Sequence, residues 1–131
     1  MLIEQKNLSV IRKNGKVPTL PFLHIKEMIL GKNYNLSIVF CTPKESRERN
    51  EVYRNKNYPT NILSFPLSKN DGEIYISLST ARKDAKNFDC SYKKFLHLLL
   101  IHGVLHLKGH SHGSTMEKKE EDYLKKLFRG T

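Results

Sequence analysis

Short runs of apolar and β-branched residues, bounded by turn-forming residues, mark four segments of the chain as β-strands. The predicted strands cover residues 2–10, 36–40, 61–65 and 73–77, and the first shows only weak alternation of apolar and polar positions. Pro66 ends the third strand. Asn70-Asp71-Gly72 is a turn signal, which predicts a hairpin between the third strand and the fourth.

Apolar residues at helical spacing predict five helices, at residues 18–30, 42–53, 78–88, 91–108 and 115–128. Thr42 and Ser91 are suited to cap the second and fourth of these helices. The charged run at residues 117–121 of the last helix is predicted to be a solvated face. Because strands precede most of the helices, the sequence predicts an α+β fold, with a small mixed sheet of about four strands packed with about five helices. A single domain is expected over residues 1–131.

Composition and charge narrow the possible environments and partners. A chain of 131 residues with 38% hydrophobic residues can bury a core without disulfides or oligomerisation, so a monomer is expected. No apolar run is long enough to span a membrane, and the N-terminus lacks a secretory signal, so a cytoplasmic protein is expected. The formal net charge of +10 favours a polyanionic partner such as RNA or DNA, although ordinary solvated basic faces give the same composition.

The strongest chemical signal is a run of three histidines spaced H-x3-H-x2-G-x2-H, formed by His102, His106 and His112 with Gly109 between the last two. Residues four apart share one face of a helix, so His102 and His106 can direct their rings to one point. A glycine commonly ends a helix, and the chain can then return His112 to the same point. Three imidazoles leave one position of a tetrahedral zinc ion open, which is typical of a catalytic site.

Two neighbours of these histidines leave alternatives open. If the helix continued through Gly109, His110 would follow His106 at i+4 and compete with His112 as a ligand, but the glycine favours His112. Gly103 stands where zinc proteases carry the glutamate that serves as general base. A glycine inside a helix indicates either close packing against another element or space for a bulky substrate, and the sequence favours neither.

A second polar segment, residues 49–66, joins the end of a basic helix to a strand. Its arginine and lysine residues lie beside tyrosines, a combination that suits phosphate contacts and base stacking, so Arg54 and Lys56 are candidate RNA-binding residues. On patterning alone, the sequence favours the simpler interpretation, a helix C-terminus with favourable cations followed by an ordinary loop.

Taken together, these segments resemble the YbeY family of bacterial endoribonucleases and ribosomal RNA maturation factors. The resemblance rests on three motifs, in the expected order: Tyr53-Arg54-x-Lys56-x-x-Pro59-Thr60-Asn61-Ile62-Leu63-Ser64-Phe65-Pro66, then Gly72-Glu73-Ile74-Tyr75-Ile76-Ser77, then His102-Gly-Val-Leu-His106-Leu-Lys-Gly109-x-x-His112. It implies a zincin-like fold, one zinc ion held by His102, His106 and His112, and a functional arginine at Arg54. It also implies single-strand-specific RNA cleavage, with small-subunit ribosomal RNA 3′-end maturation and ribosome quality control as its setting. The family usually has Tyr-Asp between the glycine and the last histidine, whereas this chain has His110 and Ser111, and so lacks the carboxylate that the family has at the position of Ser111.

The expected chemistry is metal-assisted hydrolysis of an RNA phosphodiester, with His102, His106, His112 and Arg54 as catalytic residues. Zinc can lower the pKa of a bound water to about 7, which would supply hydroxide without the missing glutamate. Attack by the 2′-OH of the RNA is equally compatible with these residues. Two other functions stay open: a zinc peptidase, which Gly103 and the positive charge oppose, and a non-catalytic ribosome-assembly factor that binds RNA, with zinc as a staple and His110 as a fourth ligand.

Overall fold

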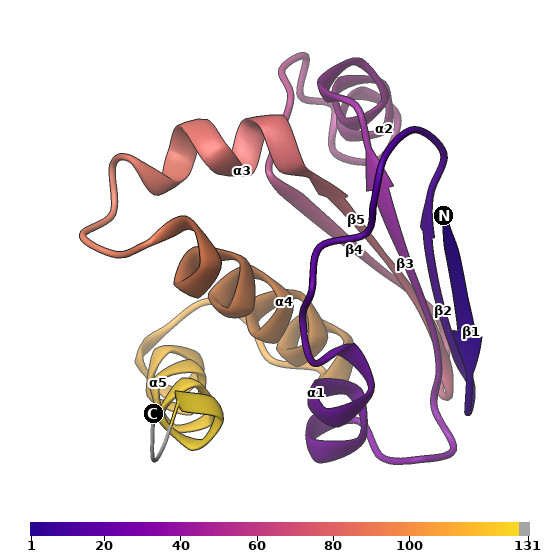
Figure 1. Ribbon diagram of the computed structural model, residues 1–131, viewed down its shortest axis with the longest axis vertical. Coiled ribbons are helices and arrows are strands. Elements are labelled where there is room, and N and C mark those ends of the chain that lie inside the picture. Colours follow the sequence, from indigo (N-terminus) through magenta and orange to yellow (C-terminus); the bar gives the residue numbers. More distant parts are fainter. Residues whose placement is uncertain (129–131) are drawn as a thin grey trace.

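The structure, a computed structural model, describes residues 1–128, and its centre is a mixed β-sheet. The strands lie in the order β1-β2-β3-β5-β4, with β1 antiparallel to β2, β2 parallel to β3, β3 parallel to β5 and β5 antiparallel to β4 (Figure 1). Their bounds are Leu2–Gln5 for β1, Leu8–Arg12 for β2, Asn35–Cys41 for β3, Ile62–Ser68 for β4 and Asp71–Ser77 for β5. The α+β class and the hairpin between the last two strands are confirmed.

The sheet has five strands because the segment predicted as one strand, residues 2–10, is two. Lys6 and Asn7 both adopt positive φ, 44° and 64°, between Gln5 and Leu8. Two successive residues of this kind form the tight turn whose twist matches a two-residue hairpin. Weak alternation in the sequence therefore reflected a chain reversal inside the segment, which adds β1 as an edge strand.

The strand predicted to end at Pro66 continues to Ser68, with a register shift between these two residues. β4 lies at an edge of the sheet, where a proline is tolerated because only one side of the strand is paired. The turn of the β4–β5 hairpin lies at Lys69 and Asn70, and Gly72 belongs to β5. A side chain at Gly72 would meet the Tyr34 hydroxyl at 2.4 Å, so this glycine serves close packing and not the turn.

Five helices surround the sheet, as expected. They are α1 (Phe22–Ile29), α2 (Pro43–Arg54), α3 (Leu78–Ala85), α4 (Tyr92–Lys108) and α5 (Ser114–Phe128). α4 lies along one face of the sheet (Figure 1). α1 and α3 both contact α4, and α5 packs on the side of α4 that is turned away from the sheet. None of the helices in residues 1–128 has the length and apolar character needed to cross a membrane.

The core lies between α4 and the inner face of the sheet. Its least exposed members, all at 0–1% exposure, are Val10, Ile25, Ile38, Ile74, Ile76, Ala81, Leu100, Ile101, Val104, Leu105 and Met116. α2 packs on the other face, where the Arg49 guanidinium lies 4.0 Å from the centre of the Tyr75 ring. Tyr75 stands between Ile74 and Ile76 in β5, so its side chain points away from α4. The edge strand β4 thus has α4 on one face and α2 on the other.

Gly103 allows α4 to approach this edge closely. A Cβ atom at Gly103 would lie 2.7 Å from Ile62 Cδ1 and 3.0 Å from Ser64 Oγ, and the Ser64 hydroxyl donates to the Gly103 carbonyl at 3.1 Å. Of the two reasons that the sequence left open for this glycine, the structure gives close packing.

Gly109 ends α4 with a φ of 110°, as the sequence predicted. We expect Gly109→Ala to lower the free energy of unfolding by about 1–2 kcal/mol, because an L-residue is strained in the left-handed region. No atom lies within 4 Å of the added Cβ, so the cost comes from the backbone alone. Urea unfolding measures it, with Lys108→Ala, an exposed helical position, as the control. Equal stability of the two variants would contradict the conclusion that position 109 needs a left-handed backbone conformation.

Candidate metal centre

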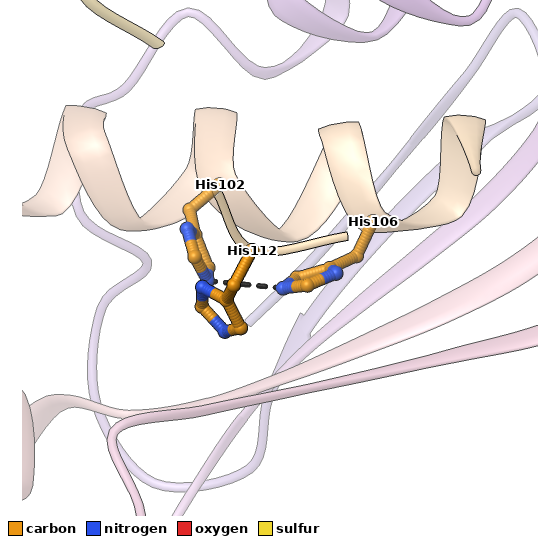
Figure 2. A group of neighbouring side chains, drawn as sticks. All are labelled: His102, His106 and His112. Atoms are coloured by element: carbon orange, nitrogen blue, oxygen red, sulfur yellow. Dashed lines mark hydrogen bonds between the residues drawn. The ribbon is translucent and has the colours of Figure 1, made fainter. Parts of the chain in front are cut away.

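Three histidine side chains converge beside the edge strand. His102 and His106 project from α4, and His112 comes from the loop between α4 and α5 (Figure 2). The ring centres are 4.6 Å apart for His102 and His106, 4.8 Å for His102 and His112, and 4.9 Å for His106 and His112. One potential ligand atom from each ring lies within 4.8 Å of the others. The convergence predicted from the spacing is thus present.

Each of the two helical histidines is oriented by a partner on its Nδ1 atom. His102 Nδ1 contacts the Glu120 carboxylate from α5, and His106 Nδ1 lies 3.1 Å from the His110 carbonyl oxygen. A carboxylate and a carbonyl accept hydrogen bonds, so both Nδ1 atoms donate and both Nε2 atoms keep their lone pairs when the rings are neutral. Such outer partners are the usual way in which proteins fix the orientation of metal-binding histidines.

The donor set fits a zinc ion. The two Nε2 atoms face one another at 3.1 Å (Figure 2), and a tetrahedral zinc with bonds of about 2.0–2.1 Å places two nitrogen ligands about 3.3 Å apart. Burial, and next the nearby His102, lower the pKa of His106, although the His110 carbonyl raises it. The His106 ring therefore tends to be neutral, the form that binds metal. A cation between the two lone pairs would remove their mutual repulsion.

His110 takes part through its backbone and not through its ring. Its carbonyl accepts from His106, whereas the group of side chains that can share a metal comprises, within residues 1–128, only His102, His106 and His112. In the structure, His112 and not His110 is the third member of the group. His110 also does not supply the fourth ligand that a closed structural site would need.

The histidines open into a cleft of about 700 Å³ along β4. Its walls come from the end of α2, the following loop, β4 and the histidine group: Tyr53, Arg54, Thr60, Asn61, Ile62, Leu63, Ser64, Phe65, Pro66, His102, His106 and His112. Arg54, the last residue of α2, lines the same cleft as the histidines. No carboxylate is among these lining residues, so the cleft suits an anionic ligand. Lys56 is exposed on the loop outside the lining, and its role in RNA binding stays a prediction.

Buried polar residues of α2 hold the loop that follows Arg54. Asn50 is fully buried and donates from Nδ2 to the Tyr58 carbonyl at 2.8 Å. Ser46 Oγ donates to the Thr60 carbonyl at 2.6 Å and accepts from the Thr60 amide at 3.0 Å. Asn55 then ends α2 in the left-handed conformation, with φ 55°. These contacts fix the path of the chain from α2 to β4, and with it the wall of the cleft that carries Arg54.

Known proteins share this arrangement of sequence and fold. The family model described as Endoribonuclease YbeY matches residues 4–128. A protein of Nautilia profundicola named Endoribonuclease YbeY is 38% identical over 100 residues, which cover 71% of this chain and 72% of that protein. One of Malacoplasma penetrans with the same name is 33% identical over 134 residues, covering 96% and 81%. The chain belongs to the YbeY family.

The fold agrees with this membership. The solution structure of TM1509 from Thermotoga maritima matches with a TM-score of 0.59 and 27% sequence identity, over 82% of this chain and 79% of that one. His110 and Ser111, the two positions where the resemblance led us to expect a departure from the family pattern, lie in the loop between Gly109 and His112. His110 contacts His106 only through its backbone carbonyl, and this contact does not depend on the His110 side chain.

Glu120 is the residue of the site that the sequence analysis missed. It lies in the charged run, residues 117–121, that was predicted to be a solvated face, and for Glu120 that prediction is wrong because its carboxylate contacts His102 and is only 15% exposed. A signal was present in the sequence. Glu120 follows the apolar residue Met116 by four positions, so the two share the inner face of α5, where Met116 is buried.

We expect Glu120→Gln to weaken zinc binding by about 10- to 100-fold, because loss of such an outer partner leaves the ligand ring less well oriented and less basic. The measurement is competition for zinc against a chelator of known affinity. Glu121→Gln is the matched control, since Glu121 is exposed and contacts only Lys125, at 3.9 Å, among the ion pairs of residues 1–128. Equal zinc affinity of the two variants would show that Glu120 does not support His102.

Proposed function

We propose that this protein is a zinc-dependent endoribonuclease that cleaves single-stranded RNA. The observation that carries the proposal is that Arg54 and three convergent histidines line one open cleft. Membership in a family described as Endoribonuclease YbeY supports RNA as the substrate. The net charge of +10 supports it as well, because a positive field raises the local concentration of a polyanion.

The protein's own residues divide the work between holding the metal and holding the substrate. His102, His106 and His112 would hold the ion, while Glu120 and the His110 carbonyl keep the two helical rings in position. When bound, a zinc ion supplies Lewis acidity, which polarises a phosphoryl oxygen and activates water near neutral pH. That chemistry needs no glutamate at position 103, where α4 requires a glycine for packing.

Arg54 would act on the substrate side of the cleft. Cleavage of a phosphodiester adds negative charge to the phosphoryl oxygens in the transition state, and a guanidinium group aimed at them stabilises that charge. Either water or the 2′-OH of the RNA can be the nucleophile with these residues in these roles. Lys56, outside the cleft, would add a contact to the phosphate backbone, which is felt in affinity more than in rate.

A direct experiment compares substrates. Zinc-loaded protein is incubated with a single-stranded RNA, the same RNA annealed to its complement, and a panel of fluorogenic peptides. We expect cleavage of the single strand, much slower cleavage of the duplex and none of the peptides. Peptide cleavage without RNA cleavage would replace the proposal with a peptidase, and RNA binding without cleavage would favour the non-catalytic assembly factor.

For the natural substrate we propose ribosomal RNA of the small subunit, with 3′-end maturation and ribosome quality control as the role, carried out by a monomer in the cytoplasm. The support is the family resemblance together with the basic surface. Purified protein incubated with small-subunit precursor RNA should shorten its 3′ end, and sedimentation of the free protein should give the mass of one chain. A precursor left intact, under conditions that cleave other single-stranded RNA, would restrict the proposal to general ribonuclease activity.

A further inference from the structure

One exposed aromatic side chain lies in the cleft. Tyr53 is 62% exposed and lines the cavity together with Arg54 and the three histidines. Tyr58, in the loop that follows, is 52% exposed but is not among the lining residues. An aromatic ring left in contact with water beside an arginine has the composition of a stacking surface for single-stranded nucleic acid.

The Tyr53 ring packs against a row of aromatic side chains. Its centre lies 4.6 Å from that of Phe65 in β4, and Phe65 lies 5.7 Å from Tyr75 in β5, edge to face. Arg49 covers the other end of this row, 4.0 Å from the centre of the Tyr75 ring. Because 62% of Tyr53 stays exposed beside this contact and Tyr53 lines the cleft, much of the ring is open to a ligand there. A ring fixed in this way loses little further freedom when a base stacks on it.

The charge of the cleft and the residues in its walls favour a nucleotide as the ligand. Tyr53 and Arg54 line the same cleft, so a nucleotide bound there could place its phosphate at the guanidinium and its base at the Tyr53 ring. The lining carries no carboxylate, and the apolar Phe65 and Pro66 continue the wall. A flat base with a phosphate on its ribose satisfies both features in every nucleotide, whereas a peptide backbone by itself offers neither an aromatic face nor a negative charge.

We propose that Tyr53 is the stacking platform for one unpaired nucleobase of the RNA, next to the phosphate that is cut. This inference rests on the proposed ribonuclease function and adds a physical origin for the preference for single strands. A base in a duplex has both faces covered by its neighbours and its edge paired, so it can reach Tyr53 only after it is unstacked.

The test uses stacking as a readout separate from cleavage. Short single-stranded RNAs, each with 2-aminopurine at one position, are mixed with zinc-loaded protein in a stopped-flow instrument, and the amplitude of the binding phase is recorded. The proteins are wild type, Tyr53→Phe, Tyr53→Ala and Tyr58→Ala, all checked for zinc content and circular dichroism. We expect one position to change fluorescence with wild type, Tyr53→Phe and Tyr58→Ala, and that change to be absent with Tyr53→Ala.

An abasic residue at the same position separates stacking from a general loss of structure. It should weaken RNA binding by wild type about tenfold or more, and Tyr53→Ala should lose as much with intact RNA and little further with abasic RNA. An abasic penalty that persists in Tyr53→Ala, or equal losses in Tyr53→Ala and Tyr58→Ala, would overturn the stacking assignment. Tyr53-dependent stacking without cleavage by any protein would leave the platform standing and overturn the ribonuclease function instead. Absence of RNA binding by wild type would overturn both.

Discussion

Replacing His112 with alanine is expected to abolish tight zinc binding and RNA cleavage together. His112 supplies one of the three convergent ligand atoms, and loss of an outer partner alone typically costs about 10- to 100-fold in affinity, so loss of a ligand should exceed about 100-fold. Cleavage should fall with zinc occupancy, because the two remaining imidazoles cannot hold the ion under ordinary conditions. The measurements are metal content after dialysis, zinc affinity by chelator competition, and the rate of cleavage of single-stranded RNA.

The matched control is His110→Ala, two residues earlier in the same loop. His110 contributes a backbone carbonyl to His106, which alanine retains, so zinc content and cleavage should stay near those of the wild type. The two variants remove the same kind of side chain from the same segment and differ only in the predicted ligand. Loss of zinc from His110→Ala with retention in His112→Ala would reverse the ligand assignment. Full activity of His112→Ala would remove the metal site from the mechanism.

Replacing Arg54 with alanine is expected to reduce the cleavage rate by about 100- to 1,000-fold at unchanged zinc content, the range found when one preorganised group that stabilises transition-state charge is removed. The reason is that Arg54 lines the same cleft as the histidines, while no hydrogen bond or ion pair within residues 1–128 joins it to them. Single-turnover cleavage at saturating protein gives the rate of the chemical step, and metal analysis of the same sample gives occupancy. Arg54→Lys should recover only part of the rate, because an ammonium group does not offer two parallel donors to a phosphate.

Arg47→Ala is the charge-matched control for Arg54. Arg47 is exposed on the same helix but does not line the cleft, so its loss changes the net charge equally and should leave the rate of the chemical step unchanged. Equal reduction by the two substitutions would indicate that Arg54 acts only through the general positive field. Loss of zinc from Arg54→Ala would give Arg54 a structural role in place of a chemical one.

The features that the sequence predicted well are those set by residues close together in the chain. α4 begins after Ser91, whose side chain accepts from the Lys94 amide, and ends at Gly109, and both signals lie next to the termini they set. α2 has the same character, since Thr42 and Glu45 form a capping box at its start. The spacing of His102 and His106 likewise depends only on the helical repeat, so their common direction followed from the sequence.

Three features that the sequence predicted wrongly or left open depend on a tertiary neighbour. The continuation of β4 past Pro66 depends on the position of that strand at the sheet edge. The reason for a glycine at position 103 is its close packing against Ile62 and Ser64. The orientation of Glu120 depends on the packing of α5 against α4. None of these partners lies near its residue in the sequence.

By itself, then, the sequence determined the helix that carries two histidines, the glycine turn that returns the third, and the basic character of the chain. Only the tertiary structure decided that Arg54 and Tyr53 line one cleft with the histidines, because α2 and α4 both contact the edge strand β4. Helix limits and spacing arise from bonds within a few residues, whereas a cleft arises from contacts between segments far apart in the chain, which no local pattern records.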